Sequence, residues 1–236
     1  MVLSFNQPVF IPWGGFFARL MSTDRLVLLD GTLFARGFTF VNRNRIKGPN
    51  GQIWITVPIK KRGRGRQKIR DLEIYQKDYW EKKFAGTLRH AYGKSIYYKE
   101  LSEDLKKITG EDDSRFLPMI CSILECLRTH LGIRTPFILQ SDIGIDGRGV
   151  DLLIKIAQQL KATQVVLPFP ASKLLAWRQI EDEGIGVRFL KFVCPVYPQF
   201  RGDFIGNLSV LDLLFCLGPL GKRILEKSYT LVTSNT

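Results

Sequence analysis

Acidic residues are absent from residues 31–70, although this stretch contains eleven Lys or Arg residues. Such a segment cannot neutralise its own charge, so its electrostatic potential should be strongly positive. We therefore expect an anionic partner, either a polyanion or the phosphates of a nucleotide or nucleotide sugar. The alternative is a solvated basic hairpin with no specific partner. The interspersed Gly, Asn and Gln residues favour a site, because they add hydrogen-bonding groups and allow close approach of the backbone.

Cysteine and histidine are scarce. The Cys residues are Cys121, Cys126, Cys194 and Cys216, and none forms a Cys-x-x-Cys pair. With only two His residues, His90 and His130, a Cys/His zinc cluster is not expected, and we predict no metal site. His130 reads as structural, near a helix end that favours a cation. Most of the cysteines lie in apolar helical patterns, which indicates reduced core residues. Reduced cysteines fit a cytoplasmic setting.

Long apolar runs are also absent. None approaches the roughly 18 residues that span a bilayer, and the N-terminus shows no signal-peptide pattern, so neither kind of segment is expected. The 236 residues are 45 % hydrophobic and include 16 Phe, enough for the core of one large domain. The net charge of +13 is uneven, because acidic residues cluster around 100–113 and 181–183. This asymmetry indicates a basic face.

The apolar pattern predicts an α/β fold. Residues 2–6 and 26–29 read as strands, and residues 33–58 read as a hairpin turning at Pro49-Asn50-Gly51. Helical patterns follow at 16–22, 78–92, 97–108 and 115–131. Beyond these, the expected strands are 137–139, 164–167 and 187–192, and the expected helices are 150–160, 171–183 and 210–217. Strands that alternate with helices imply parallel pairing.

We therefore predict a layered, mostly parallel Rossmann-like sheet flanked by helices, with a basic β-hairpin insertion and a helical middle segment. The predicted organisation is a single α/β domain over residues 1–229, followed by a flexible tail over 230–236. Within the domain, residues 31–70 form the basic hairpin and loop, and residues 78–131 form the helical segment.

Polar residues stand where several predicted strands end, which is where open α/β sheets bind ligands. Asn6 and Gln7 follow the first strand, Asp30 follows the second, and Ser141 and Asp142 follow the strand at 137–139. The alternative is that both Asp residues only cap turns, as most such residues do. Residues 144–149 form a Gly-rich connection that includes Arg148 and precedes a predicted helix. This connection allows phosphate binding at the start of that helix. The alternative is a connection without a ligand, because Gly-rich loops between strands and helices are common.

Five separated motifs occur in order along the chain. They are Asn6-Gln7-Pro8 with Ile11-Pro12-Trp13-Gly14-Gly15-Phe16; Asn42-Arg43-Asn44-Arg45-Ile46-Lys47; Trp54-Ile55-Thr56-Val57-Pro58 with Lys60-Lys61; Pro195-Val196-Tyr197-Pro198-Gln199-Phe200; and Asn207-Leu208-Ser209-Val210-Leu211-Asp212-Leu213-Leu214-Phe215. In these motifs the chain resembles the WbqC-like family over nearly its full length.

The resemblance implies a bacterial or archaeal protein associated with O-antigen and surface-polysaccharide gene clusters. It also implies a transferase that attaches an amino-acid or acyl group, such as glycine, to an amino sugar. Two departures stand out: the family usually has His where this chain has Asn6, and a Ser-Gly-Pro type loop where this chain has residues 165–170. An Asn cannot act as a general base near neutral pH, although it can still hydrogen-bond a ligand.

The first functional hypothesis is a transferase acting on a nucleotide-linked amino sugar, with ATP as cosubstrate if a carboxylate is activated as an adenylate. In this hypothesis Asp30 or Asp142 takes the proton from an attacking amine, and Trp13 or Tyr197 stacks on the ligand. The expected phosphate-binding residues are Arg43, Arg45, Lys60, Lys61 and Arg64. The other expected substrate-binding residues are Asn6, Gln7, Asn42, Asn44, Ser141, Gln199 and Asn207.

The second hypothesis is a nucleic-acid-binding module that uses the basic segment 43–70, with Phe38, Phe40 and Trp54 as stacking platforms. It ranks lower because the segment contains no recognised nucleic-acid motif. A third and minor hypothesis is that the basic face makes a peripheral contact with an anionic membrane surface.

Overall fold

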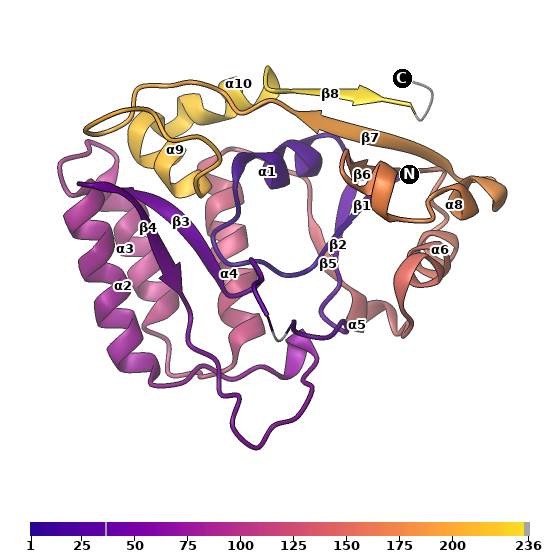
Figure 1. The fold of residues 1–236 in the computed structure, drawn as a ribbon, viewed down its shortest axis with the longest axis horizontal. Helices are drawn as coiled ribbons and strands as arrows, with labels where there is room; N and C mark the ends of the chain where they lie inside the picture. Colours follow the sequence, from indigo (N-terminus) through magenta and orange to yellow (C-terminus); the bar gives the residue numbers. More distant parts are fainter. Residues whose placement is uncertain (36, 234–236) are drawn as a thin grey trace.

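A six-stranded sheet forms the centre of the molecule (Figure 1). The computed structural model describes residues 1–35 and 37–233, with the backbone alone at Leu174. The strands are β1 (Val2–Asn6), β2 (Arg25–Leu28), β5 (Phe137–Leu139), β6 (Gln164–Pro168), β7 (Gly186–Phe192) and β8 (Tyr229–Val232), in the spatial order β5-β2-β1-β6-β7-β8. Only the pairing of β7 with β8 is antiparallel in this sheet. The predicted α/β fold with a mostly parallel sheet is confirmed.

Helices cover both faces of the sheet. Leu3 and Phe5 of β1 pack into one apolar cluster with α6 (Gly149–Gln159) and α8 (Arg178–Asp182). Alternate strand residues point to opposite faces, and Leu26 of β2 packs into the cluster that contains α1 (Gly14–Met21). Figure 1 shows α1 and α6 on opposite sides of β1 and β2. Burial on both faces explains why these strands are continuously apolar.

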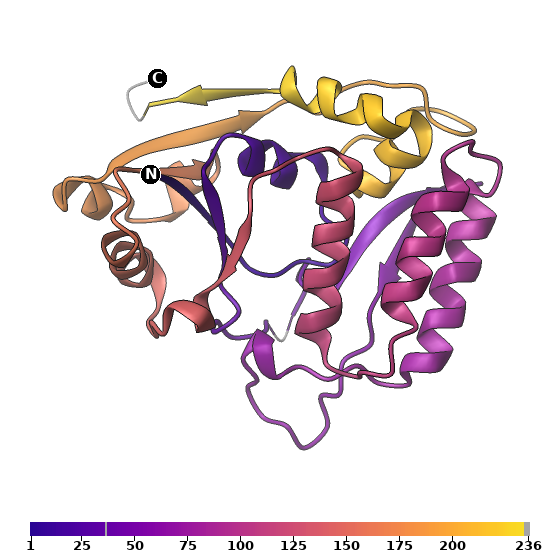
Figure 2. The same cartoon turned by 180° about the vertical axis from the view of Figure 1, so that it is seen from behind.

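The helical middle segment consists of α2 (Lys77–Tyr92), α3 (Tyr98–Thr109) and α4 (Phe116–His130). These three helices lie side by side at the end of the molecule remote from α6 (Figure 2). The apolar stripe of α4 is buried as its 3.6-residue period predicts.

The basic hairpin consists of β3 (Arg43–Gly48) and β4 (Gly51–Thr56), which pair antiparallel from Arg43 opposite Thr56 to Gly48 opposite Gly51. Gly51 has φ of +117°, which a residue with a side chain rarely adopts. The hairpin packs against α2 and α9 (Val210–Leu217), and its Ile46 and Ile55 join the same apolar cluster as α1. It is therefore part of the core and not a free arm.

Two segments differ from the sequence-based prediction. The helix expected over 171–183 is divided into α7 (Ala171–Leu174) and α8, because Leu175 is extended and the buried Trp177 donates its Nε1–H to the carbonyl of Ser172 at 3.0 Å. Residues 230–232 were expected in a flexible tail, but they belong to β8, which pairs with the edge of β7 as far as Val232. Residues 234–236 of that predicted tail lie outside the described residues.

The remaining elements are short. They are α1 (Gly14–Met21), α5 (Gln140–Ile143), α10 (Gly221–Glu226), and the 3-10 turns η1 (Ile69–Asp71) and η2 (Gly218–Leu220). Of these, only α1 was expected from the sequence. In the described part of the chain, every helix falls short of the length and apolar character that crossing a bilayer requires.

Candidate ligand site at the carboxyl end of strand β1

The carboxyl end of β1 lies where the order of strands reverses. The chain places β2 and β5 on one side of β1, and β6 and β7 on the other. Open α/β sheets bind ligands in the crevice at such a point. A cavity of about 380 Å³ lies there, lined by Asn6, Val9, Pro12, Trp13, Phe16, Phe40, Asn44, Arg45 and Asn207. We call it the β1-end cavity.

The loop from β1 to α1 is held in a strained conformation beside this cavity. Ile11 has φ of +38°, a region that β-branched residues avoid. Its carbonyl accepts a hydrogen bond of 2.9 Å from the Nδ2 of Asn44, and the neighbouring Phe10 N–H donates to the carbonyl of Val41 at 2.9 Å. Strain of this kind costs about 1–3 kcal/mol and persists only where surrounding contacts fix it. The hairpin thus holds the cavity wall in place.

Replacing Asn44 by alanine is expected to destabilise the fold by about 1–3 kcal/mol, because the buried carbonyl of Ile11 loses its donor. The loop should also open locally, which hydrogen–deuterium exchange of residues 7–13 would detect. Asn50→Ala at the exposed hairpin turn is the control. Unchanged exchange in the Asn44 variant would mean that the loop does not depend on the hairpin.

The start of α1 contributes Trp13 and Phe16 to the lining of the same cavity. Trp13 is the residue before the helix, its side chain does not cap the helix, and the first turn contains no acidic residue. The first backbone N–H groups of a helix carry partial positive charge, although the N–H of Phe16 already donates to the carbonyl of Trp13 at 3.1 Å. A Cβ on Gly15 would lie 2.5 Å from the Trp13 ring, so glycine lets the indole fold over this first turn. The cavity therefore combines an anion-binding helix end with an aromatic wall.

A buried arginine adds positive charge at the β1 end. Arg19 of α1 donates to the carbonyl of Phe5 at 3.1 Å and to the Oδ1 of Asn6. Burial lowers the pKa of Arg19 to about 10, which leaves the guanidinium charged at neutral pH. The ion pairs found among the described residues do not include Arg19. Its charge therefore adds to the positive potential beneath Asn6.

Asn6 itself is oriented by these contacts. Its Oδ1 accepts from Arg19, and its Nδ2 donates to the carbonyl of Gln7 at 2.7 Å. The Nε2 of Gln7 donates to the Oγ1 of Thr32 at 2.9 Å, which ties the end of β1 to the loop after β2. Asn6 lines the cavity as a fixed amide, whereas Gln7 lies outside the lining and acts as a tether.

Arg45 of β3 lies on the opposite wall. Its Nη1 donates to the Oε1 of Gln52 at 2.9 Å and its Nη2 to the carbonyl of Asn207 at 3.1 Å, while its Nε is buried without a partner. Asn207 has φ of +55°, and its N–H donates to the Sγ of Cys194 at 3.1 Å. Each Nη has a second N–H beyond the one used here, so this guanidinium retains capacity for an anionic ligand.

An exposed aromatic cluster continues from this wall. Phe38, Phe40 and Trp54 are 62 %, 44 % and 36 % exposed, and their ring centroids lie 5.2–6.0 Å apart. The Arg43 guanidinium lies 4.7 Å from the Trp54 ring centroid and 5.3 Å from that of Phe38. Only Phe40 of the three rings lines the β1-end cavity.

A buried polar network connects the hairpin to α9. Asp212 is fully buried and accepts hydrogen bonds from the hydroxyl of Tyr92 at 2.7 Å, the hydroxyl of Tyr197 at 2.8 Å and the Nε2 of Gln199 at 2.8 Å. The buried Lys47 amine of β3 donates to the Oε1 of Gln199 at 3.1 Å. We call these five residues the Asp212 network. Burial raises the pKa of Asp212, and the hydrogen bonds and the Lys47 charge oppose that rise.

The Asp212 network accounts for two residues that the sequence suggested as ligand contacts. The Tyr197 hydroxyl is used by Asp212, and burial raises its pKa far above the ordinary value. The Gln199 amide contacts Lys47 and Asp212 and also pairs with the backbone of Ile205. Both lie outside the lining of the β1-end cavity. Their contacts position the loop that ends at Asn207.

The two predicted carboxylates lie at the ends of β2 and β5. Asp30 is fully buried, its Oδ1 accepts from the N–H of Ser141 at 3.0 Å, and its Oδ2 is buried without a partner. Asp142 and Ser141 are exposed. The structure therefore brings the ends of β2 and β5 together as expected, but these residues do not line the β1-end cavity.

A second cavity of about 470 Å³ adjoins those strand ends. It is lined by Gly31, Thr32, Leu33, Lys68, Asp146, Gly147, Arg148 and Gly149. The Gly-rich segment predicted to cradle a phosphate therefore does form a cavity wall. However, the Lys68 amine is paired with Asp146 at 3.2 Å, so part of its positive charge is already neutralised.

The remaining basic residues of the hairpin loop are arranged differently from the expected phosphate clamp. Lys60 and Arg64 both pair with Glu73, at 2.9 Å and 2.8 Å, and their hydrogen bonds lower the pKa of Glu73. The exposed Lys61 amine lies 5.4 Å from the ring centroid of Phe34. Asn42 is buried and donates to the carbonyl of Val57 at 2.7 Å, which closes the base of the hairpin.

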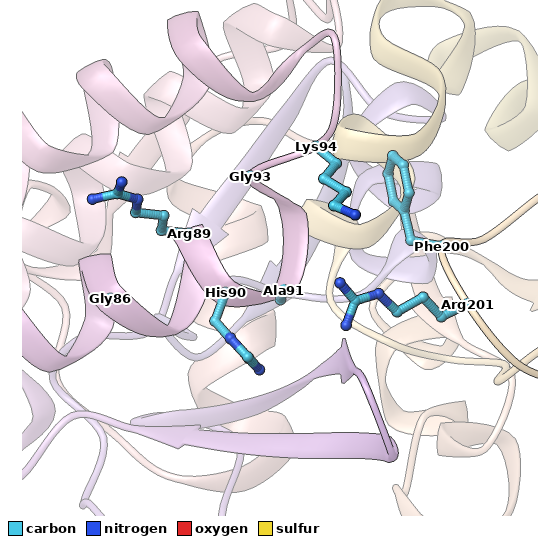
Figure 3. Close-up of a pocket in the computed structure, with 8 residues that line it drawn as sticks. All are labelled: Gly86, Arg89, His90, Ala91, Gly93, Lys94, Phe200 and Arg201. Atoms are coloured by element: carbon cyan, nitrogen blue, oxygen red, sulfur yellow. The ribbon is translucent and has the colours of Figure 1, made fainter.

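A third cavity, of about 430 Å³, is lined by Gly86, Arg89, His90, Ala91, Gly93, Lys94, Phe200 and Arg201 (Figure 3). In Figure 3, Lys94 and Arg201 extend toward each other beside Phe200, whereas Arg89 points away. The cavity lies at the C-terminal end of α2, whose partial negative charge favours cations. The C-terminal end of α2 thus accounts for the basic residues that line this cavity. We therefore place the main candidate site at the β1-end cavity.

Sequence reasoning identified Asn6, Trp13, Asn44, Arg45 and Asn207 as candidates, and the structure brings all five into one cavity. It missed Arg19. A signal for this residue was present in the sequence, because Arg19 is the single charged residue of the apolar helix α1.

The fold and this cavity define an open α/β protein of Rossmann-like topology with a cationic, hydrogen-bonding cavity at the carboxyl end of its first strand. The chain belongs to the WbqC-like protein family, whose model matches residues 7–224. It is also similar to the uncharacterized protein Rv1507c of Mycobacterium tuberculosis, with 30 % identity over 214 residues that make up 90 % of this chain and 92 % of that protein. No solved structure matches the chain.

Proposed function

We propose that the chain is a transferase of surface-polysaccharide (O-antigen) synthesis that binds ATP or a nucleotide-linked amino sugar in the β1-end cavity. The observation that supports this most is the meeting of the α1 N-terminus, Arg45 and Trp13 around one cavity. Helix N-termini and guanidinium groups bind phosphate, and an indole ring stacks on a base or sugar. Asn44 and Asn207 supply further polar groups that orient the ligand.

The chemistry of the lining favours carboxylate activation. None of the nine lining residues is Asp, Glu or His, so the cavity offers no general base of its own. A carboxylate substrate needs none, because it is already an anion at neutral pH. In this step a carboxylate oxygen of an amino acid such as glycine attacks the α-phosphorus of ATP. The new O–P bond forms as the bond to pyrophosphate breaks, and Arg45 and the α1 N–H groups stabilise the developing charge.

Transfer to the amino sugar is the second step. The sugar amine attacks the acyl carbon of the adenylate, and AMP leaves with the electrons of the broken C–O bond. The amine must lose a proton in this step. Of the two predicted carboxylates, Asp142 is exposed at the end of β5 and Asp30 is fully buried, and neither lines the β1-end cavity. In this proposal solvent therefore takes up the proton.

ATP–pyrophosphate exchange tests the first step, with each amino acid supplied in turn. The proposal predicts exchange that depends on one amino acid and is lost in Trp13→Ala, while Tyr79→Ala, which removes an exposed ring on α2, leaves it intact. ATP binding without exchange for any carboxylate would overturn the activation step and leave only a nucleotide site.

A nucleic-acid-binding role is the second candidate, and the exposed cluster of Phe38, Phe40 and Trp54 with Arg43 favours it. Bases stack on such rings at about 1–3 kcal/mol each. Phosphate contacts would make the binding fall steeply with salt, with a slope of about −0.7 per contact for single strands. Peripheral contact of the same basic face with anionic lipid is a further, accessory proposal.

Fluorescence anisotropy with a short single-stranded RNA separates these candidates. Binding that is lost between about 50 and 200 mM salt, and that weakens in Trp54→Ala, would support the second candidate. Affinity that is the same at both salt concentrations, or equal in Trp54→Ala and the wild type, would contradict it.

A further inference from the structure

Three side chains of different chemistry meet between α3 and α4, away from the β1-end cavity. They are Asp104 of α3 and Cys126 and His130 of α4, and one ligand atom from each lies within 4.8 Å of the other two. The Nε2 of His130 lies 2.8 Å from the Oδ2 of Asp104. Residues four apart on a helix share a face, and Figure 2 shows α3 and α4 side by side.

We propose that Asp104, Cys126 and His130 bind a zinc ion. Sulfur, imidazole nitrogen and carboxylate oxygen are the donor set that Zn²⁺ takes in proteins. Bonds of about 2.0–2.3 Å to these atoms place tetrahedral ligands about 3.3–3.8 Å from one another. Small side-chain rotations on two packed helices reach this arrangement, and water completes the fourth position.

The surroundings allow the ion to enter and to be held. The side chains of Asp104 and His130 are 53 % and 18 % exposed, so the site is open to solvent on one side. The nearby Arg128 is paired with Glu125 and donates to the carbonyl of Ile133, so its charge is already compensated. Zinc also prefers such a mixed donor set over the oxygen ligands that suit Mg²⁺ or Ca²⁺. The bound ion would join α3 to α4 independently of the proposed transferase chemistry.

The sequence alone does not reveal this site. We expected no metal because the chain has two His residues and no Cys-x-x-Cys pair. The missing ligand, Asp104, comes from a different helix and lies 22 residues before Cys126 in the chain. Without the metal, His130 and Asp104 are hydrogen-bonded beside a reduced cysteine.

Cobalt substitution tests the proposal, because a thiolate bound to Co²⁺ gives a near-ultraviolet charge-transfer band. We expect one Co²⁺ per chain with this band, its displacement by Zn²⁺, and a Zn²⁺-dependent rise in Tm. Cys126→Ser should abolish the band. Cys121→Ser is the matched control, since Cys121 lies on the same helix and is also half-buried.

Asp104→Asn gives a second variant at an exposed position, in case the cysteine variant folds poorly, with Glu103→Gln on the same helix as its control. Loss of a residue that hydrogen-bonds a metal ligand weakens metal affinity by about 10- to 100-fold. Loss of Asp104, a direct ligand, should therefore weaken Zn²⁺ binding at least about tenfold. The proposal is overturned if wild-type protein gives no thiolate band, or if Cys126→Ser keeps the band and Cys121→Ser loses it.

Discussion

Replacing Asp212 by alanine should lower the free energy of unfolding by more than about 3 kcal/mol, because three side-chain donors lose their acceptor and each buried donor left unsatisfied costs about 1–3 kcal/mol. These donors belong to Tyr92, Tyr197 and Gln199. The substitution also removes a negative charge near the buried amine of Lys47, which reaches Asp212 only through Gln199. Urea denaturation followed by circular dichroism measures the effect.

Two further variants separate charge from hydrogen bonding. Tyr197→Phe removes one donor and keeps the carboxylate, so it should cost only about 1–3 kcal/mol. Asp212→Asn keeps the shape and removes the charge, and should fall between the other two. Surface substitutions usually change stability by no more than about 0.5 kcal/mol. If Asp212→Ala stays within that range of the wild type, the Asp212 network does not hold the hairpin to α9.

The same carboxyl gives a pH dependence of known sign. Because the pKa of Asp212 is raised in the folded state, the folded protein binds this proton more tightly than the unfolded chain does. Its contribution therefore makes stability fall as pH rises from the ordinary Asp pKa through the raised one. Glu73 and Asp113 have lowered pKa values and act in the opposite sense. The difference between wild type and Asp212→Asn isolates the Asp212 contribution.

Replacing Arg45 by glutamine should weaken ATP binding about 10- to 100-fold, because a charge-assisted hydrogen bond is worth about 1.5–3 kcal/mol. The fold should tolerate the change, since Arg45 is only half-buried at the hairpin edge. Arg64→Gln is the matched control: it removes the same charge from the same basic segment, but its guanidinium pairs with Glu73.

Isothermal titration of the two variants with ATP gives the comparison. A loss confined to Arg45→Gln would indicate direct contact with the phosphates. Equal losses in both variants would mean that the basic segment acts only through its overall field, and the proposed contact would then be wrong.

Local structure was largely predictable because its causes are local. The strand at residues 2–6 ends at Asn6 as expected, since Pro8 cannot continue a strand. The hairpin turn follows from Pro49, Asn50 and Gly51. The division of the predicted 171–183 helix was not predictable, because the inward turn of Trp177 depends on packing against β7.

The candidate site was predictable only in part. Strand-end reasoning and the motif resemblance identified the polar lining of the β1-end cavity. They could not show that Lys60 and Arg64 share Glu73 as an ion-pair partner, because Glu73 lies beyond the acid-free stretch. Nor could they show that Gln199 and Tyr197 serve Asp212, because that depends on long-range contacts between the 197–199 segment and α9.

Locating a bound nucleotide in a crystal of the protein grown with ATP or a nucleotide sugar tests the central claim most directly. The account predicts phosphate density between the N-terminus of α1 and Arg45, with the base or sugar against Trp13. Density in the cavity of Lys68 and Arg148, or beside Lys94 and Arg201, would contradict it.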